Sequence, residues 1–114
     1  MENCIFCRII NKELPATVVY ENDHVIVIRD INPQAKIHVL AITKKHIESV
    51  NNIRESEKED IYQVHLAIQE TAKILGVDKS GYRIISNCGK GAGQTVLHLH
   101  YHILAGDNIN ESLI

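Results

Sequence analysis

The segment His98-Leu99-His100-Tyr101-His102 alternates histidine with apolar or aromatic residues. Side chains of a β-strand point alternately to its two faces, so a strand places all three imidazoles on one face. In a helix, His100 would point away from His98 and His102. An ordinary half-buried strand is the alternative, but such strands favour Thr, Val and Tyr over repeated His. The alternation therefore predicts a strand with a three-imidazole surface, its neighbouring histidines roughly 6–7 Å apart.

Strand patterns surround one long helical pattern. A capping box at residues 56–59 and a glycine cap at Gly76 bound a helix from about 57 to 75. Its apolar stripe is Ile61, Val64, His65, Ile68, Ala72 and Leu75. Strands are expected over 17–21, 24–28, 37–42, 82–86 and 96–104, and short helices over 4–12 and 46–53, the first with Cys4, Ile5 and Ile9 on one side. This order predicts one α+β domain over residues 1–114 with a mostly antiparallel sheet.

Composition excludes several classes of protein. The 114 residues are 45% hydrophobic with a formal net charge of −2, which argues against disorder. No apolar run approaches about 18 residues, so no membrane partner is expected. The basic residues are spread along the chain, which argues against a nucleic-acid partner. Met1-Glu2-Asn3-Cys4 lacks a basic n-region, so we expect no secretory signal and a cytoplasmic protein.

A glycine-rich segment, Asn87 to Thr95, directly precedes the histidine strand. Three glycines in five residues allow the backbone to present several N–H groups to one anion. The segment is not a Walker P-loop, because it lacks the Gly-Lys-Ser/Thr ending and leads into a strand. Alone it would be a connecting turn. Beside a row of imidazoles it predicts an oxyanion cradle next to a nucleophile or base, which suits phosphorus chemistry.

Cys4 and Cys7 form a Cys-x-x-Cys pair, which is half of a zinc site. His46 and His98 are the candidate completing ligands. Two ordinary small residues on a short helix, or a thioredoxin-like redox pair, are the alternatives. The redox interpretation is weak because no strand precedes the pair. Cys88 is expected to be unpaired and structural.

The histidines outside the triad have open assignments. His38 lies in an apolar strand, where a satisfied structural histidine is the common case. It joins the imidazole surface only if residues 37–42 neighbour the histidine strand. His24 follows a turn and is expected to be exposed. His65 lies on the helical stripe and is expected in the core or at an interface.

The chain resembles the histidine-triad (HIT) superfamily. His98-x-His100-x-His102-Ile103-Leu104 is similar to the family signature, in which histidine alternates with apolar residues. Five further segments resemble the histidine-triad nucleotide-binding branch, in its bacterial form with an N-terminal Cys-x-x-Cys. These segments are 4–10, 13–16, 30–35, 44–47 and 93–96.

The resemblance implies a HIT-like fold: a five-stranded, mostly antiparallel sheet with one long and one short helix, assembled as a homodimer. It implies a purine nucleotide pocket for AMP, GMP and their phosphoramidates. The implied activity is hydrolysis of the P–N bond of nucleoside 5′-phosphoramidates through a nucleotidyl-histidine. Dinucleoside polyphosphate hydrolysis and a non-enzymatic nucleotide-binding or scaffold module stay as alternatives. A metalloenzyme using the cysteine zinc is a third.

Residue roles follow from the resemblance, position by position. His100 matches the nucleophile, and His98 orients it through its backbone carbonyl. His102 and Asn87 match phosphate contacts, with His102 or Thr95 as routes for protonating the leaving amine, and His38 matches a histidine that supports the triad. Asp30 matches the carboxylate that binds both ribose hydroxyls. The remaining nucleotide residues are the phosphate turn Gly93, Gln94 and Thr95, and the apolar base walls Phe6, Leu14, Ile28 and Ile31.

The resemblance also bears on cofactors. Bacterial relatives with Cys-x-x-Cys hold zinc with that pair and the equivalents of His46 and His98, so a structural zinc is expected here and no cofactor for catalysis. Residues 105–114 lack the aromatic-bearing tail of several relatives, which leaves the leaving-group side of the pocket open. The last triad position is histidine and not glutamine, which argues against the nucleotidyl-transferase branch.

Overall fold

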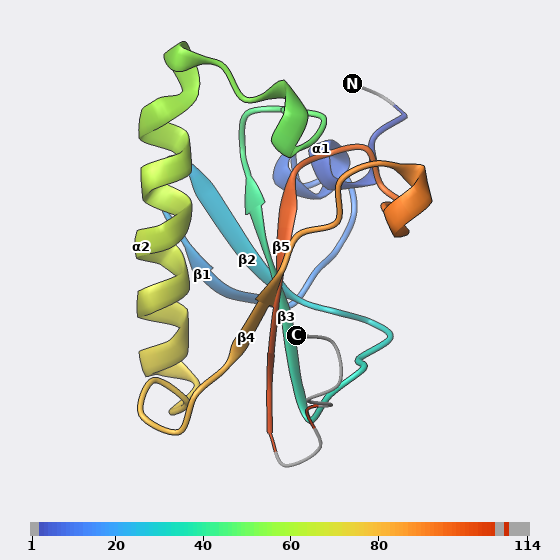
Figure 1. Cartoon of the computed structure of the whole chain (residues 1–114). Helices are drawn as coiled ribbons and strands as arrows, with labels where there is room; N and C mark the ends of the chain where they lie inside the picture. The colour runs from blue at the N-terminus through green and yellow to red at the C-terminus, as the bar shows by residue number, and fades with distance from the viewer. Residues whose placement is uncertain (1–2, 107–108, 110–114) are drawn as a thin grey trace.

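The computed structural model describes residues 3–106 and 109 (Figure 1). Its main elements, in chain order, are α1 (Ile5–Ile10), β1 (Val18–Glu21), β2 (Val25–Arg29), β3 (Ile37–Thr43), α2 (Lys58–Ile74), β4 (Arg83–Ile85) and β5 (His100–Ala105). Three 3-10 turns, Val50–Asn52, Glu55–Glu57 and Lys90–Ala92, complete the described secondary structure. The expected α+β fold is confirmed, with five strands in one antiparallel sheet of order β1-β2-β3-β5-β4.

The β1–β2 hairpin forms at the expected turn. The side-chain oxygen of Asn22 accepts hydrogen bonds from the backbone N–H groups of His24 and Val25, at 2.8 and 2.9 Å. Asn and Asp favour turns because their short side chains can bond the backbone two residues ahead. His24 is half-buried, not fully exposed, because its Nδ1 lies 3.0 Å from Asp60 on α2.

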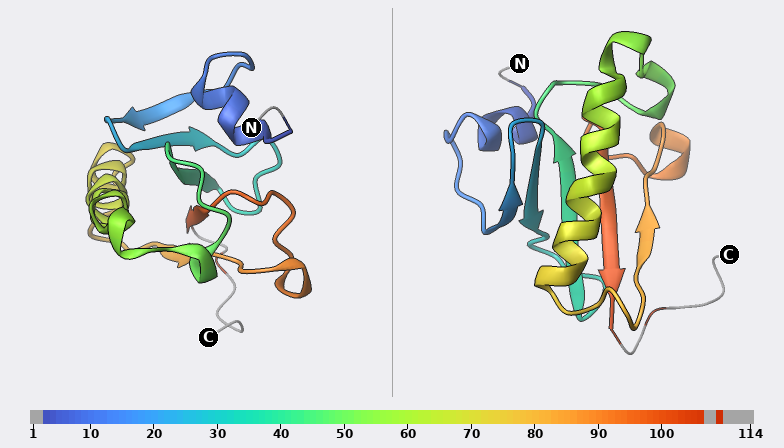
Figure 2. Two further views of the ribbon diagram at one scale, coloured as in Figure 1. Left: turned by 90° about the horizontal axis from the view of Figure 1, so that it is seen from above. Right: turned by 90° about the vertical axis from the view of Figure 1, so that its left-hand side faces the viewer.

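The two faces of the sheet carry different layers (Figure 2). On one face, Val64, Ala67 and Ile68 of α2 pack against a cluster of strand residues: Val25, Val27, Val39, Ala41 and Ile103. On the other face, Phe6 of α1 packs on Ile26, Ile28, Leu40 and Ile42. Because the short helix covers only part of that second face, polar side chains of β3 and β5 have room there.

The start of α2 differs from the expectation. The capping box is not at residues 56–59 but two residues earlier: Glu57 accepts a 2.8 Å hydrogen bond from the backbone N–H of Arg54. The Glu57 side chain is buried and also lies 3.2 Å from the Lys45 ammonium. The Gly76 cap is confirmed, since this glycine has φ of 72° and donates to the Lys73 carbonyl.

The predictions of the apolar stripe of α2 and of the packed side of α1 were partly wrong. Val64, Ile68 and Ala72 are buried, but His65 is exposed and lies beside Tyr101 with a ring separation of 6.1 Å. On α1 the buried residue is Phe6, whereas Ile5 is 47% exposed.

Two further expectations were wrong in extent. Residues 46–53 do not form an α-helix, and Val50–Asn52 is a single 3-10 turn. The last strand begins at His100 and not at residue 96, because the chain bends at 96–98 and the Leu99 N–H donates to Ile47 at 2.6 Å.

Most of the C-terminal stretch 105–114 lies outside the described residues. Among those that are described, no helix is long and apolar enough to cross a membrane.

Candidate active site and metal centre

Strand register gathers the histidines on the face opposite α2. Leu40 pairs with His102 and Ile42 with His100, and His38 lies two residues before Leu40 on the same face of β3. His38 is therefore a diagonal neighbour of His102, close enough for their side chains to meet. The structure thus places His38 in the imidazole surface.

His100 is held in one orientation by its neighbours. Its Nδ1 lies 2.7 Å from the His98 carbonyl oxygen, so Nδ1 carries the proton and donates it. Nε2 then keeps its lone pair. The Phe6 ring packs against the His100 ring in a T-shaped contact at 5.0 Å, and the Ser86 hydroxyl donates to the His100 carbonyl at 2.9 Å. The arrangement leaves one nitrogen of His100 able to act as a nucleophile or base.

Burial lowers the pKa of His100 below its usual value, against the smaller opposing effects of the His98 carbonyl and the Asp30 charge. A lowered pKa keeps the imidazole neutral at physiological pH. The neutral form is the one that can attack phosphorus.

A hydrogen-bonded chain assigns the protons of His38 and His102. The Gln34 backbone N–H donates to His38 Nδ1 at 3.0 Å, so His38 carries its proton on Nε2. That Nε2 lies 2.9 Å from His102 Nδ1 and 3.4 Å from an Asp30 carboxylate oxygen. With His102 Nδ1 as acceptor, the neutral His102 ring carries its proton on Nε2.

His102, the third triad histidine, is also held neutral. Burial, together with the smaller effects of nearby His100 and His38, lowers its pKa to about 4, against the opposing effect of Asp30. His100 and His102 therefore offer different groups from adjacent rings 5.2 Å apart: a lone pair and an N–H donor.

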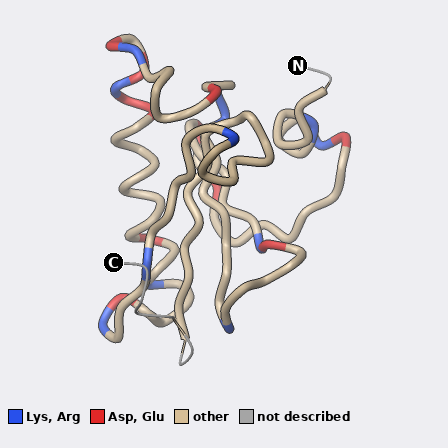
Figure 3. The backbone as a smooth tube through the Cα atoms, turned by 45° about the vertical axis from the view of Figure 1, so that its right-hand side comes forward, with Lys and Arg blue, Asp and Glu red and all other residues tan. Residues whose placement is uncertain are grey.

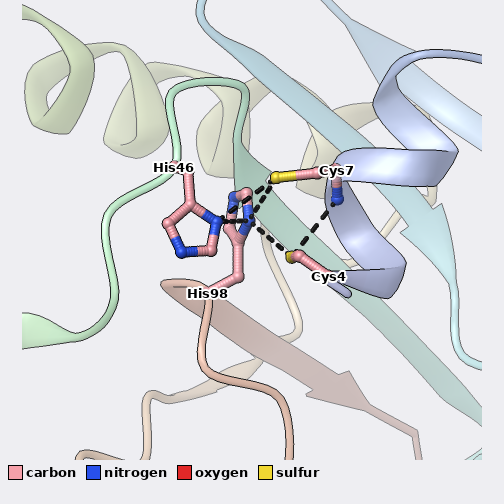
Figure 4. Close-up of side chains that lie close together, drawn as sticks. All are labelled: Cys4, Cys7, His46 and His98. Carbon is pink, nitrogen blue, oxygen red and sulfur yellow. Dashed lines mark hydrogen bonds between the residues drawn. The ribbon is translucent and has the colours of Figure 1, made fainter. Parts of the chain in front are cut away.

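Four side chains from three distant segments meet beside the triad (Figure 4). Cys4 and Cys7 come from α1, His46 from the chain after β3, and His98 from the bend before β5. Cys4 Sγ lies 3.2 Å from His98 Nδ1, Cys7 Sγ lies 3.2 Å from His46 Nδ1, and the two Nδ1 atoms are 3.1 Å apart. All four donor atoms lie within 4.8 Å of one another.

These four residues fit a tetrahedral metal ion. Zinc–ligand bonds of about 2.0–2.3 Å place the donors of a tetrahedron roughly 3.3–3.8 Å apart, close to the spacing observed. His98 Nε2 lies 2.6 Å from the Thr43 carbonyl and donates to it, which leaves Nδ1 as an unprotonated donor atom. A Cys2His2 set with no open position is typical of a structural site.

Protonation states agree with this set. Burial lowers the pKa of His98 to about 4, so its imidazole is neutral. Burial and the adjacent Cys4 raise the pKa of the Cys7 thiol to about 11. Without a metal ion, the thiolate form of these cysteines is unfavourable. A bound cation would stabilise the thiolates, so metal binding is coupled to release of the thiol protons. The structure therefore brings together all four metal ligands expected from the sequence.

Asp30, His38 and His102 form a second group whose donor atoms lie within 4.8 Å of one another. Their hydrogen bonds to each other and to Gln34 account for this closeness without an ion.

The glycine loop closes on itself beside the triad. Gly89 and Gly93 take φ of 89° and 87°, which other residues adopt only with strain. The Gly89 carbonyl accepts from the backbone N–H groups of Ala92 and Gln94, and the Gly93 N–H donates to Lys90. Asn87 lies just after β4, and Thr95 is exposed at the other end of the loop. Gln94 is buried, and its side chain bonds the backbone within and beside this loop.

The expected base walls lie in different surroundings. Phe6 and Ile28 belong to one buried cluster, while Ile31 is 92% exposed next to Asp30. Leu14 lines a cavity of about 470 Å³ between α1 and the first strands. A second cavity, of about 570 Å³, adjoins the metal cluster and includes Thr95, Ile5 and Leu97.

Lysine and arginine are spread over the described chain and interspersed with acidic residues (Figure 3). Any anion at the triad would therefore be held by amides and imidazoles more than by a basic patch.

Sequence reasoning missed three contributors to the site. Thr43 and Ser86 act through a backbone carbonyl and a hydroxyl that meet the triad only in the fold. Phe6 was expected as a base wall, and its contact with the nucleophile ring was not foreseen. Neither a carbonyl contact nor a ring contact across about 90 residues has a local sequence signal.

Comparison with known proteins agrees with the geometry. The HIT domain family profile matches residues 11–109. A HIT-like protein of Methanocaldococcus jannaschii is 46% identical over 101 residues, covering 89% of this chain and 77% of the relative. A solved HIT family hydrolase from Clostridium thermocellum is 49% identical with a TM-score of 0.95, covering 100% of this chain and 99% of that one. A histidine triad nucleotide-binding protein from Candida albicans is 32% identical with a TM-score of 0.82, covering 89% and 73%.

With two triad histidines on β5, the third in the bend just before it, His38 beside them on β3 and a profile match over most of its length, the chain belongs to the HIT domain family.

Proposed function

We propose that this protein is a purine nucleoside phosphoramidate hydrolase of the histidine-triad nucleotide-binding branch. The observation that carries the proposal is the assignment of protons in the triad. His100 presents a free Nε2 lone pair because its Nδ1 donates to the His98 carbonyl, and His102 presents an Nε2–H because its Nδ1 accepts from His38. One imidazole is thus prepared as a nucleophile and the next as a donor.

The reaction would proceed in two displacements at phosphorus. His100 Nε2 attacks, a P–N bond to histidine forms, and the P–N bond to the leaving amine breaks. The amine takes a proton from the His102 Nε2–H or through the Thr95 hydroxyl as it departs. Water then attacks the nucleotidyl-histidine and gives a proton back to the group that lost one, His102 Nε2 or the Thr95 oxygen; the P–N bond to His100 breaks, which releases the nucleoside monophosphate and restores neutral His100. The neutral, buried triad supports this course because no histidine must lose a proton before attack.

Nucleoside recognition would lie at the Asp30 end of the site. The Asp30 carboxylate lies 3.4 Å from His38 Nε2, at the edge of the triad, which supports the proposal that it binds the ribose. Ile31 exposes nearly its whole side chain next to it, as expected for a residue that packs on a base. Asn87, Gly93 and Thr95 stay predictions as phosphate contacts, and Gln94 as a residue of the same turn. Phe6 and Ile28 stay predictions as walls around the base.

The Cys4, Cys7, His46 and His98 cluster would hold a structural zinc. When bound, zinc would join α1 to the bend before β5. Catalysis itself would need no cofactor, because the triad supplies both nucleophile and proton donor.

A homodimer is the proposed assembly. On the α2 face of the sheet, α2 packs over β1, β2 and β3, and at the β4 edge Ile84 is 44% exposed. Tyr62 and Ile74 of α2 are 59% and 56% exposed. Exposed apolar residues beside a sheet edge support association with a second copy. A cytoplasmic location, and the lack of membrane or nucleic-acid partners, stay predictions.

The test compares wild type with His100→Ala on adenosine 5′-phosphoramidate and on diadenosine triphosphate, with AMP binding measured on both proteins. We expect phosphoramidate turnover that disappears in the variant while AMP still binds. Preference for the dinucleotide would assign the protein to the other hydrolase activity. Folded protein that binds AMP and cleaves neither substrate would make it a binding module.

A further inference from the structure

The side chain of Gln94 makes three hydrogen bonds, all to backbone. Its Oε1 accepts from the Gly89 N–H at 2.8 Å, and its Nε2 donates to the Glu48 carbonyl at 2.8 Å and the Val96 carbonyl at 3.1 Å. The residue is 6% exposed. An amide has one oxygen and two N–H donors, so these contacts use both N–H groups and leave little capacity for a ligand.

Hydrogen bonds between Gln94 and Gly89 join the two ends of the loop. Gly89 O accepts from the Gln94 backbone N–H while Gly89 N–H donates to the Gln94 side chain, so residues 89–94 form a closed ring. Within that ring, Gly89 and Gly93 have positive φ. Glycine moves between positive and negative φ at little cost, so these two residues do not by themselves keep the loop in one shape. A glycine-rich loop needs an external restraint to keep one shape, and Gln94 supplies it.

Gln94 also ties the loop to the segment that positions the triad. The Glu48 carbonyl accepts from the Gln94 side chain, and the carbonyl of the preceding Ile47 accepts from the Leu99 N–H. One residue before Ile47 lies His46, which belongs to the metal cluster. Residues 43–48 therefore contact the histidine strand and the glycine loop at once. A fixed loop on a fixed segment sets the distance between loop amides and the His100 imidazole.

We propose that Gln94 is a positioning residue, which shapes the glycine loop for a nucleotide phosphate and does not itself bind the nucleotide. The inference rests on the proposed function, because it takes loop 89–94 as the phosphate cradle. It replaces the expectation that Gln94 is a nucleotide contact. A preformed loop binds phosphate without the cost of ordering its glycines on binding.

The test uses Gln94→Met, which keeps the side-chain length but removes all three hydrogen bonds. The matched control is Gln69→Met, an exposed glutamine on α2. Three measurements are made: calorimetric binding of AMP and of adenosine, kcat and KM for adenosine 5′-phosphoramidate, and the Gly89 amide resonance in the ligand-free protein.

We expect Gln94→Met to weaken AMP binding and raise KM by about tenfold, the effect of leaving a buried amide partner unpaired. Adenosine, which lacks the phosphate, should lose less than twofold. The Gly89 amide should shift and exchange faster without ligand, and the control should match wild type throughout.

Two results would overturn the inference. Weaker AMP binding with an unchanged Gly89 amide would make Gln94 a direct ligand. Equal losses for AMP and adenosine would indicate general damage to the site.

If Gln94→Met does not fold, Gln94→Glu replaces it. This variant keeps the acceptor for Gly89 but places oxygen against the Glu48 and Val96 carbonyls. The Gly89 amide should then stay near its wild-type position, while the resonances of Glu48 and Val96 shift and AMP loses more affinity than adenosine. Loss of AMP affinity with the resonances of Glu48 and Val96 unchanged would make Gln94 a direct ligand. Wild-type protein that binds neither AMP nor adenosine would refute the proposed function, while the Gly89 resonance would still test the restraint on the loop.

Discussion

At the scale of single residues, three chemically identical side chains acquire three roles from their hydrogen-bond partners. His98 donates through Nε2 to Thr43 and offers Nδ1 to the cysteines, whereas His100 donates through Nδ1 and offers Nε2. His102 accepts at Nδ1 from His38. The tautomer of each ring, and so its chemistry, is set by which carbonyl or ring nitrogen lies next to it.

The lowered histidine pKa values predict the pH dependence of turnover. Burial keeps His100 below the ordinary histidine pKa, and places His102 at about 4. Protonation removes the lone pair of His100, so kcat/KM should be level near pH 7 and fall on acidification, with a midpoint below about 6.5. A pH–rate profile on adenosine 5′-phosphoramidate checks this. A midpoint above 7 would mean that the nucleophile is charged in the resting protein.

Asp30→Ala should weaken binding of AMP more than binding of 2′-deoxy-AMP. A carboxylate that accepts hydrogen bonds from both ribose hydroxyls loses one of them in the deoxy compound, and charged hydrogen bonds contribute about 1.5–3 kcal/mol each. We expect AMP to lose about tenfold or more and the ribose preference to shrink. Because Asp30 also accepts from the Asn32 backbone N–H, Asp30→Asn, which keeps an oxygen acceptor for that bond but removes the charge, separates loop damage from loss of the carboxylate. An unchanged ribose preference would remove Asp30 from the ribose site.

At the scale of elements, the proposed zinc site would add a second attachment of α1 to the fold, beside its packing on the sheet. The helix has six residues, and Phe6 is its buried residue. Such a short helix is unstable alone, so its place on the sheet comes from tertiary contacts. Cys4 caps its start and Cys7 lies in its first turn, so both thiols approach His46 and His98 from one end of the helix.

Cys7→Ser should therefore lose bound zinc and thermal stability together. We expect metal content to fall from about one ion per chain to near zero, and Tm to fall by about 5–10 °C, as a loss of 1–2 kcal/mol gives in a domain of this size. Chelation of wild type should give the same Tm. Cys88→Ser is the matched control, because Cys88 is a free thiol that contacts Ser49 outside the cluster. Loss of zinc with an unchanged Tm would show that the ion does not hold α1.

The elements that the sequence predicted are those with local signals. A short apolar run marked β3, alternation marked the histidine strand, Asn22 marked the hairpin turn, and Gly76 marked the end of α2. Two of the failures involve distant contacts. The capping box lies two residues early, where Glu57 also pairs with Lys45, and β5 starts late, where Leu99 bonds Ile47. The metal ligands were foreseen from residue type, but the restraint through Gln94 has no signal in its neighbours.

At the scale of the whole molecule, α2 covers one face of the sheet, the histidines lie on the other, and β4 is an edge strand among the described residues. A three-residue edge strand with an exposed isoleucine is a surface on which another chain can pair or pack. Tyr101 and Ile103 of the neighbouring β5 share the α2 face, with His65 of α2 beside Tyr101. Ile103 pairs with Ile84 across the two strands and Tyr101 is a diagonal neighbour of Ile84, so the proposed homodimer would be centred there.

Ile84→Lys should convert the dimer to a monomer. A lysine at the centre of an apolar interface loses its hydration without a partner, which costs far more than the same change on a free surface. Wild type should sediment as a dimer at micromolar concentration, and Ile84→Lys as a monomer with an unchanged circular dichroism spectrum. Val50→Lys is the matched control, since Val50 has the same 44% exposure but lies on the 3-10 turn after β3. A wild-type monomer would refute the dimer, and a dimeric Ile84→Lys would move its interface away from the β4 edge.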